Sequence, residues 1–181
     1  MATTRTYTIE ELETDPPEGE WELIDGALIP MVPSGFESSS IAARITRIIG
    51  NHVEEHDLGE VTGADGGYVI FSNRQTLRVP DVAFVRTERL PAPAERRGFA
   101  RLAPDLAVEV LSPSNRPIEL FAKVEMYREA GIPLIWLVDP EEKTVTVIAA
   151  GKPTVTLHAG DTLDGGAVLP GFNVPVARLF G

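Results

Sequence analysis

The feature that most constrains the fold is a near-continuous apolar run, Leu134-Ile-Trp-Leu-Val, which follows a helical segment ending near Gly131 and Pro133. Such a run is typical of a central strand covered on both faces, because a strand with one wet face alternates apolar and polar residues. The chain must therefore supply helices that cover a sheet, which favours a layered fold of helices and strands.

Two segments have the residue spacing of helices that could cover this sheet. The first opens at about Ser38 and stops near Gly59. The second runs from about Arg116 to Ala130, with Asn115 as its expected cap. The apolar stripe of the first helix is made by Ile41, Ile45, Ile48, Ile49, His52 and Val53.

Strands and turns account for much of the remaining chain. Asp25-Gly26 is a strong tight-turn signal and predicts a hairpin over residues 21–31. Thr8 and Glu11 predict a capping box on a short N-terminal helix. We expect an α/β (α+β) fold with one mixed β-sheet flanked by helices, an N-terminal hairpin and a C-terminal strand extension. Further strands are expected around residues 61, 68–71, 77–85, 106–111, 145–148 and 154–157.

Length and composition indicate one domain over residues 1–181, without an internal repeat or linker. No run reaches the ~18 apolar residues of a membrane span, and the first residues lack the apolar region of a signal peptide. The chain has no cysteine, which excludes disulfides and cysteine-based metal sites. We expect a cytoplasmic protein.

The net charge of −11 argues against a protein that coats nucleic acid nonspecifically, since neutralising phosphates requires Lys and Arg. It does not exclude a nuclease, whose acidic site becomes neutral when a metal binds. Arg44 and Arg47 form one candidate basic spot, and Arg96, Arg97 and Arg101 form another. Solvated surface charge is the alternative for both, so nucleic-acid-binding residues stay unassigned.

Two carboxylates stand where the strand pattern calls for apolar residues. Alternation puts Asp81 on the same face as Val79 and Ala83. Glu109 is embedded in the otherwise apolar stretch Leu-Ala-Val-Glu-Val-Leu. Burying a lone carboxylate is costly, so each of the two needs a partner.

Lys123 is the third misplaced charge. It follows helical spacing with Leu120, Val124 and Tyr127, which puts its ammonium group in the inward stripe. An inward lysine beside two carboxylates fits an Mg²⁺ site, where the lysine would orient or deprotonate water or neutralise the transition state. It also fits a buried salt bridge, or a lysine that reaches back to the helix edge. On spacing alone the salt bridge is the favoured reading, and the metal site stays open.

Three segments, together with Lys123, resemble the Uma family of putative restriction endonucleases, a domain of unknown function within the PD-(D/E)XK nuclease superfamily. They are Arg78-Val-Pro-Asp-Val-Ala-Phe-Val, Pro104-Asp-Leu-Ala-Val-Glu-Val-Leu and Tyr127-Arg-Glu-Ala-Gly-Ile-Pro-Leu-Ile-Trp. The resemblance covers nearly the whole chain. It implies a restriction-endonuclease-like core, Mg²⁺ or Mn²⁺ as cofactor, hydrolysis of phosphodiester bonds in double-stranded DNA, and a homodimer.

The resemblance also implies roles for particular residues. Carried over by position, the catalytic set is Asp81, Glu109 and Lys123, and the metal-binding set is Asp81, Glu109 and Val110. The superfamily pattern places a lysine two residues after the acidic residue, where this chain has Leu111. In the Uma branch that lysine lies on the following helix, which corresponds to Lys123.

Two further carboxylates, Glu22 and Glu37, are possible additions to the site. For Glu22 a solvated strand residue is the favoured reading. Glu37 precedes Ser38, which stands where the family often has a histidine. The missing histidine and the low Lys and Arg count motivate an alternative function, a catalytically inactive nuclease-fold scaffold or nucleic-acid-binding protein.

His52-Val-Glu-Glu-His56 matches the short H-x-x-E-H pattern of some zinc peptidases. Helical spacing brings both histidines to one face, but no downstream glutamate stands out as a third ligand. Core or interface histidines are the favoured reading, and a histidine at a helix C-terminus is stabilised in any case.

Overall fold

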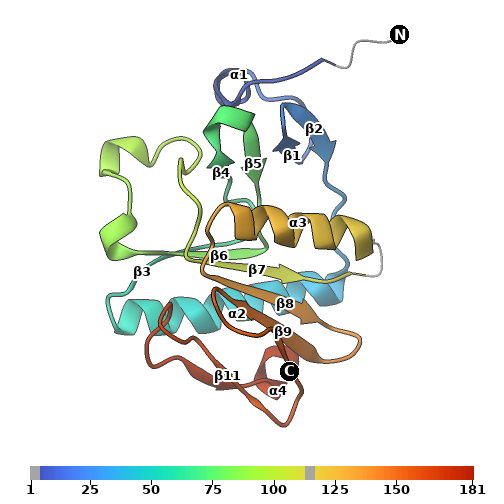
Figure 1. Ribbon diagram of the computed structural model, residues 1–181, viewed down its shortest axis with the longest axis vertical. Helices are drawn as coiled ribbons and strands as arrows, with labels where there is room; N and C mark the ends of the chain where they lie inside the picture. The colour runs from blue at the N-terminus through green and yellow to red at the C-terminus, as the bar shows by residue number, and fades with distance from the viewer. Residues whose placement is uncertain (1–4, 113–116) are drawn as a thin grey trace.

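The computed structural model describes residues 5–112 and 117–181 (Figure 1). Its largest sheet has six strands in the order β10-β9-β8-β7-β6-β3. β7 and β8 pair in parallel and the other neighbours pair antiparallel, so the sheet is mixed, as expected. The apolar run forms β8, an interior strand. The bounds are β3 (Gly59–Thr62), β6 (Val82–Arg86), β7 (Leu106–Val110), β8 (Leu134–Asp139), β9 (Thr144–Ala149) and β10 (Val155–Leu157).

The expected hairpin is present, but it belongs to a second sheet of four strands in the order β2-β1-β5-β4. Asp25 and Gly26 have φ of 49° and 80°, which are the left-handed conformations of a tight hairpin turn. β11 and β12 form a third sheet, so the expectation of one sheet is wrong. The bounds are β1 (Trp21–Ile24), β2 (Ala27–Pro30), β4 (Tyr68–Phe71), β5 (Thr76–Arg78), β11 (Thr162–Asp164) and β12 (Asn173–Pro175).

The continuous strand predicted over residues 77–85 is also wrong. The chain leaves the four-stranded sheet after β5 and enters the six-stranded sheet at β6. Pro80 lies between them, and proline has no N–H to donate to a strand ladder. Asp81 therefore lies at the crossing between the two sheets instead of inside a strand.

Helices α2 (Phe36–Glu55) and α3 (Pro117–Glu129) are the two expected long helices. α2 begins before Ser38, with Gly35 as its cap, and ends before Gly59, which instead opens β3. The predicted cap Asn115 and the predicted first residue Arg116 lie outside the described residues. Short helices are α1 (Ile9–Thr14), which has the predicted Thr8–Glu11 capping box, α4 (Ala177–Phe180), and the 3-10 turns Ser72–Arg74, Thr87–Arg89 and Pro93–Glu95.

Alternation along β7 decides which residues meet which helix. Val108 and Val110 belong to the core cluster that contains the apolar stripe of α2. Ala107 belongs to the cluster that contains Val124 and Tyr127 of α3. Figure 1 shows α3 between the four-stranded and the six-stranded sheet. Side chains of both sheets therefore meet the inward face of α3. None of the described helices is both long and apolar enough to cross a membrane.

Candidate active site

Asp81 and Glu109 lie close to Lys123 at the inward face of α3. Lys123 Nζ is 2.7 Å from Glu109 Oε2, and Glu109 is only 8% exposed. Asp81 Oδ2 accepts a hydrogen bond from the backbone N–H of Val110 at 2.7 Å, which ties the crossing after β5 to the end of β7. Asp81 thus lies beside the strand that carries Glu109, as expected. The continuous strand from which the orientation of Asp81 was predicted is absent.

Glu109 points toward α3 because it follows Ala107 by two residues on β7. Lys123 and Tyr127 are one helical turn apart on α3 and face the same way. The hydroxyl of Tyr127 donates to Glu109 Oε1 at 2.6 Å, while Lys123 donates to the other oxygen. Both oxygens of this buried carboxylate are therefore held by one helix.

Glu22 joins the same cluster, so its favoured reading as a solvated strand residue is wrong. It is 7% exposed, and its Oε1 lies 3.3 Å from Lys123 Nζ. Its other contacts come from the four-stranded sheet: Arg78 Nη1 donates to Oε2 at 2.6 Å, and the Val79 N–H donates to Oε1 at 3.0 Å. The hairpin brings Glu22 to the face of this sheet that meets α3.

Burial and mutual charge shift the pKa values within the cluster. Burial raises the pKa of Glu109 to about 7, against the lowering effect of the Lys123 charge. Burial also raises the pKa of Asp81. For Glu22 burial acts in the same direction, but the charges of Lys123 and Arg78 outweigh it and hold its pKa below the usual value. For Lys123, burial favours the neutral amine, but Glu109 and Glu22 outweigh it and raise the pKa. Lys123 therefore stays an ammonium group.

The donor set suits a hard divalent cation. Among the described residues, the three carboxylates of Glu22, Asp81 and Glu109 act on one another electrostatically and face two cations, Lys123 and Arg78, so one negative charge is uncompensated when all three are ionised. Mg²⁺ prefers oxygen ligands of this kind. Over residues 5–112 and 117–181, no three His, Asp or Glu side chains are already grouped around a metal position. A metal site here would consist of two carboxylates completed by main-chain oxygen or water.

Val110, named from the resemblance as a metal ligand, contributes its backbone alone to this region. Its side chain is buried in the core on the α2 face of the sheet. Its N–H binds Asp81, as described above, so its carbonyl oxygen is the atom left to consider. Leu111, which stands at the superfamily's lysine position, donates its N–H to the carbonyl of Val138 at 2.8 Å. The ammonium group of the site comes from α3 instead.

Sequence reasoning missed Arg78 and gave Tyr127 only a place in the apolar stripe. Arg78 is 5% exposed and also directs Nη2 at the sulfur of Met126 on α3, at 3.1 Å. The available signals were a lone arginine between apolar residues for Arg78 and the four-residue spacing from Lys123 for Tyr127. Neither signal identifies a partner, because the partners lie far away in the sequence: Glu22 for Arg78 and Glu109 for Tyr127.

Glu37 lies apart from Lys123. It is exposed in the first turn of α2 and lines a hollow of about 870 Å³ at the end of β7, together with Leu111 and Leu120. Ser38, which stands where the family often has a histidine, donates its hydroxyl to the carbonyl of Gly35 at 3.2 Å. Ser38 thus makes a local hydrogen bond in the first turn of α2.

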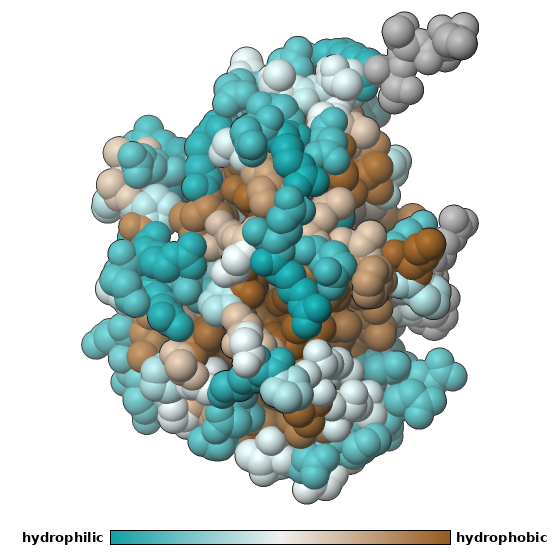
Figure 2. Space-filling model, viewed as in Figure 1, coloured by the Kyte–Doolittle hydropathy of each residue, from teal (hydrophilic) through white to brown (hydrophobic). Residues whose placement is uncertain are grey.

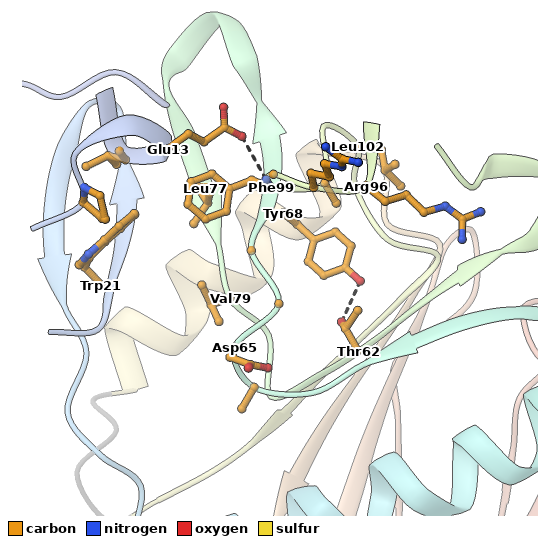
Figure 3. A pocket seen from close by; sticks show the side chains of 18 of the residues that line it. Glu13, Trp21, Thr62, Asp65, Tyr68, Leu77, Val79, Arg96, Phe99 and Leu102 are labelled. Atoms are coloured by element: carbon orange, nitrogen blue, oxygen red, sulfur yellow. Dashed lines mark hydrogen bonds between the residues drawn. The ribbon is translucent and has the colours of Figure 1, made fainter. Parts of the chain in front are cut away.

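A larger cavity, of about 920 Å³, lies on the other side of β5 (Figure 3). Leu77 and Val79 line it, whereas Arg78 between them turns toward Glu22 and α3. The charged residues Glu22, Arg78, Asp81, Glu109 and Lys123 are not part of its lining. Its aromatic lining consists of Trp21, Tyr68 and Phe99.

The candidate basic spots are largely engaged within the molecule. Arg44 donates to the carbonyl of Leu179, Arg96 lies 3.5 Å from Glu60, and Arg101 pairs with Glu10 and Glu13. Arg47 and Arg97 are exposed. These contacts do not define a nucleic-acid surface.

The two histidines of the H-x-x-E-H pattern are explained by local structure. His52 Nε2 lies 3.0 Å from the carbonyl oxygen of Pro170, and His56 Nδ1 lies 2.9 Å from that of His52. Their ring centroids are 4.4 Å apart. No third ligand accompanies them in the described part of the chain. The zinc-peptidase reading has no support.

Two comparisons with known proteins find similarity to proteins described as putative nucleases. The model of a family described as "Putative restriction endonuclease", Uma2, matches residues 7–177. A solved structure of a "putative nuclease belonging to DUF820" from Anabaena variabilis ATCC 29413 is similar, with a TM-score of 0.80 and 22% identity. The similarity covers 96% of this chain and 97% of that chain, and it confirms the expected fold. No curated protein matches the chain.

Proposed function

The chain belongs to the Uma2 family of putative restriction endonucleases, and on this premise we propose that it is a metal-dependent endonuclease that hydrolyses phosphodiester bonds in double-stranded DNA. The observation that carries the proposal is the buried cluster of Asp81, Glu109 and Lys123. Among the described residues, Asp81, Glu109 and the adjoining Glu22 face two cations, Lys123 and Arg78, a charge imbalance that a divalent metal would relieve.

In this proposal Asp81, Glu109 and the carbonyl of Val110 hold Mg²⁺, or Mn²⁺ in its place. The bound cation would lower the pKa of a water molecule and stabilise negative charge on the phosphoryl group. Asp81 and Glu109 lie at the junction of two sheets, where Pro80 and β7 fix their backbones. The geometry of the ligands is thus set by rigid elements.

Lys123 acts as an ammonium group in this scheme. Glu109 and Glu22 raise its pKa, which favours charge stabilisation over proton abstraction. Glu22, itself paired with Arg78, holds the ammonium from the side of the four-stranded sheet. Of the roles considered for this lysine, neutralising the transition state and orienting the attacking water fit the structure best.

A cleavage assay tests the proposal. Purified protein is incubated with supercoiled, linear duplex and single-stranded DNA, with Mg²⁺ or Mn²⁺, beside the variants Glu109→Ala and Glu125→Ala. We expect the wild type and Glu125→Ala to cut, because Glu125 is an exposed carboxylate of α3 paired with Arg128. Glu109→Ala should lose cutting by at least about a hundredfold, as expected on removing a metal ligand and its charge.

If the wild type leaves every substrate as intact as Glu109→Ala does, the nuclease proposal fails. The inactive scaffold, motivated by the low Lys and Arg count and by Ser38 at the place of the family's histidine, is then the better account. Calorimetry would characterise such a scaffold by the absence of Mg²⁺ or Mn²⁺ binding.

The proposal includes a homodimer, since two copies would present two sites to the two strands of a duplex, and it places the protein in the cytoplasm with its DNA substrate. Large apolar side chains exposed outside the site support association: Phe36 is 92% exposed, Ile118 76% and Phe121 67%. Figure 2 shows apolar surface over the end of α3. Gathered apolar surface of this kind marks interaction sites.

A further inference from the structure

Tyr127 is a fully buried phenol that apolar packing alone does not explain. Its exposed fraction is 0%, and its ring packs in the cluster that contains Ala107, Val124 and Ile135. Burying a hydroxyl without a partner would cost free energy, so the partner it has is informative. That partner is Oε1 of Glu109, at 2.6 Å.

The two oxygens of Glu109 are held by two different donors from the same helix face. Tyr127 takes Oε1 and Lys123 takes Oε2. The terminal torsion of a glutamate is broad when it is unrestrained. Two donors one helical turn apart fix the plane of the carboxylate, and with it the directions in which its remaining lone pairs point.

A tyrosine suits this task because it orients the carboxylate without adding a positive charge. A phenol hydroxyl is neutral and has one hydrogen to donate, which it gives here to Oε1 of Glu109. Lys123, in contrast, brings a charge that would compete with a metal for the same oxygen.

We propose that Tyr127 is a positioning residue that orients the Glu109 carboxylate for a divalent cation. This inference rests on the proposed function in one respect, since it takes Glu109 to be a metal ligand. Groups that hydrogen-bond to metal ligands set ligand orientation, and removing them typically costs about 10–100-fold in metal affinity or activity.

The test compares Tyr127→Phe with a matched control, Tyr68→Phe. Tyr68 is also buried, at 2% exposure, and its hydroxyl pairs with Thr62 Oγ1 at 2.8 Å, away from the carboxylate cluster. Both variants remove one buried hydroxyl and keep the ring. Calorimetric titration with Mn²⁺ should show binding weakened at least about tenfold in Tyr127→Phe and within about twofold of wild type in Tyr68→Phe.

A spectroscopic readout on metal-free protein separates positioning from general destabilisation. With ¹³C-labelled glutamate, the carboxyl signal of Glu109, assigned by its loss in Glu109→Gln, should shift in Tyr127→Phe and stay in place in Tyr68→Phe. In the wild type, titration with Mg²⁺ should also move the ¹³Cζ signal of Tyr127 and leave that of Tyr68 unchanged. The wild-type titration decides the matter even if Tyr127→Phe does not fold.

The inference is overturned if Tyr127→Phe binds Mn²⁺ as tightly as wild type, or if the Tyr127 signal does not respond to saturating Mg²⁺. Failure of the nuclease proposal looks different. In that case the wild type cuts no DNA, while metal binding and the carboxyl signal still report whether Tyr127 orients Glu109.

Discussion

Burial and the charge of Lys123 act in opposition on Glu109. It lies under α3 with Lys123 against one oxygen, yet its pKa is raised to about 7 because desolvation outweighs the lysine. Without metal, Glu109 therefore takes up a proton as the pH falls through about 7. A bound cation would stabilise the ionised carboxylate of Glu109, so metal binding is expected to release that proton.

This shift predicts how stability depends on pH without metal. Between its ordinary pKa of 4.5 and its folded value of about 7, Glu109 keeps its proton when folded and loses it when unfolded. Its contribution to stability is therefore greatest at low pH and falls as pH rises through about 7. Relative to wild type, Glu109→Gln should gain free energy of unfolding between about pH 5 and pH 8, by roughly 3 kcal/mol at most.

Urea titrations in the presence of a chelator measure this difference at each pH. The exposed residue Glu20 offers the matched substitution, and Glu20→Gln should track the wild type at all pH values. A Glu109→Gln difference that is flat with pH, or that moves against the variant as pH rises, would show that the carboxylate is not held neutral by burial.

The burial of Glu22 and the position of Asp81 between two sheets were not predicted from the residues around them. The pattern around Glu22 has no local sign of burial, because its partner Arg78 is contributed by another strand of the sheet. The apolar alternation around Asp81 continues past Pro80, and the proline, which cannot donate to a strand ladder, was the one local sign of the crossing between sheets. By contrast, the inward direction of Lys123 follows from helical spacing within α3 alone, and the structure confirms it.

The β1–β2 hairpin is the element that delivers Glu22 to the cluster. Its turn was predictable because Asp-Gly accepts the positive φ values that the tight turn requires. The assignment of its strands to a separate sheet was not, since strand pairing depends on contacts with β5 that the local sequence does not encode.

A pair of glycine substitutions tests the role of this turn. A Cβ on Gly26, at φ of 80°, would lie 3.4 Å from the carbonyl oxygen of Tyr7 in a conformation that L-residues avoid. Gly26→Ala should therefore lower the free energy of unfolding by about 1–2 kcal/mol. Gly50, inside α2 with open space around it, should respond oppositely, and Gly50→Ala should raise stability by about 0.5–1 kcal/mol.

Thermal or urea unfolding of the two variants gives both values under one set of conditions. Equal effects of the two substitutions, or a gain for Gly26→Ala, would contradict the turn geometry and with it the account of how Glu22 reaches α3.

At the scale of the whole molecule, α3 lies between the two larger sheets: it packs against one through Tyr127 and contacts the other through Met126. Because one helix serves both sheets, we propose that the chain folds as one domain. The exposed apolar side chains of Phe36, Ile118 and Phe121 fit the proposed dimer.

Scanning calorimetry over a range of protein concentrations tests both statements. One domain predicts a single transition whose calorimetric and van't Hoff enthalpies agree once dissociation is included. A dimer predicts a Tm that rises with protein concentration, because mass action favours the associated state. Two resolved transitions would contradict the single domain, and a Tm independent of concentration would contradict the dimer.

The most direct test of the central claim is a crystal structure of the protein soaked in Mn²⁺, with the ion located by its anomalous signal. The account predicts one ion bound by both Asp81 and Glu109, at oxygen distances of about 2.0–2.2 Å, with the Lys123 ammonium within about 4 Å of the site. An ion bound elsewhere, or no ion while Glu109 stays paired with Lys123 and Tyr127, would show instead that the cluster is a buried salt bridge.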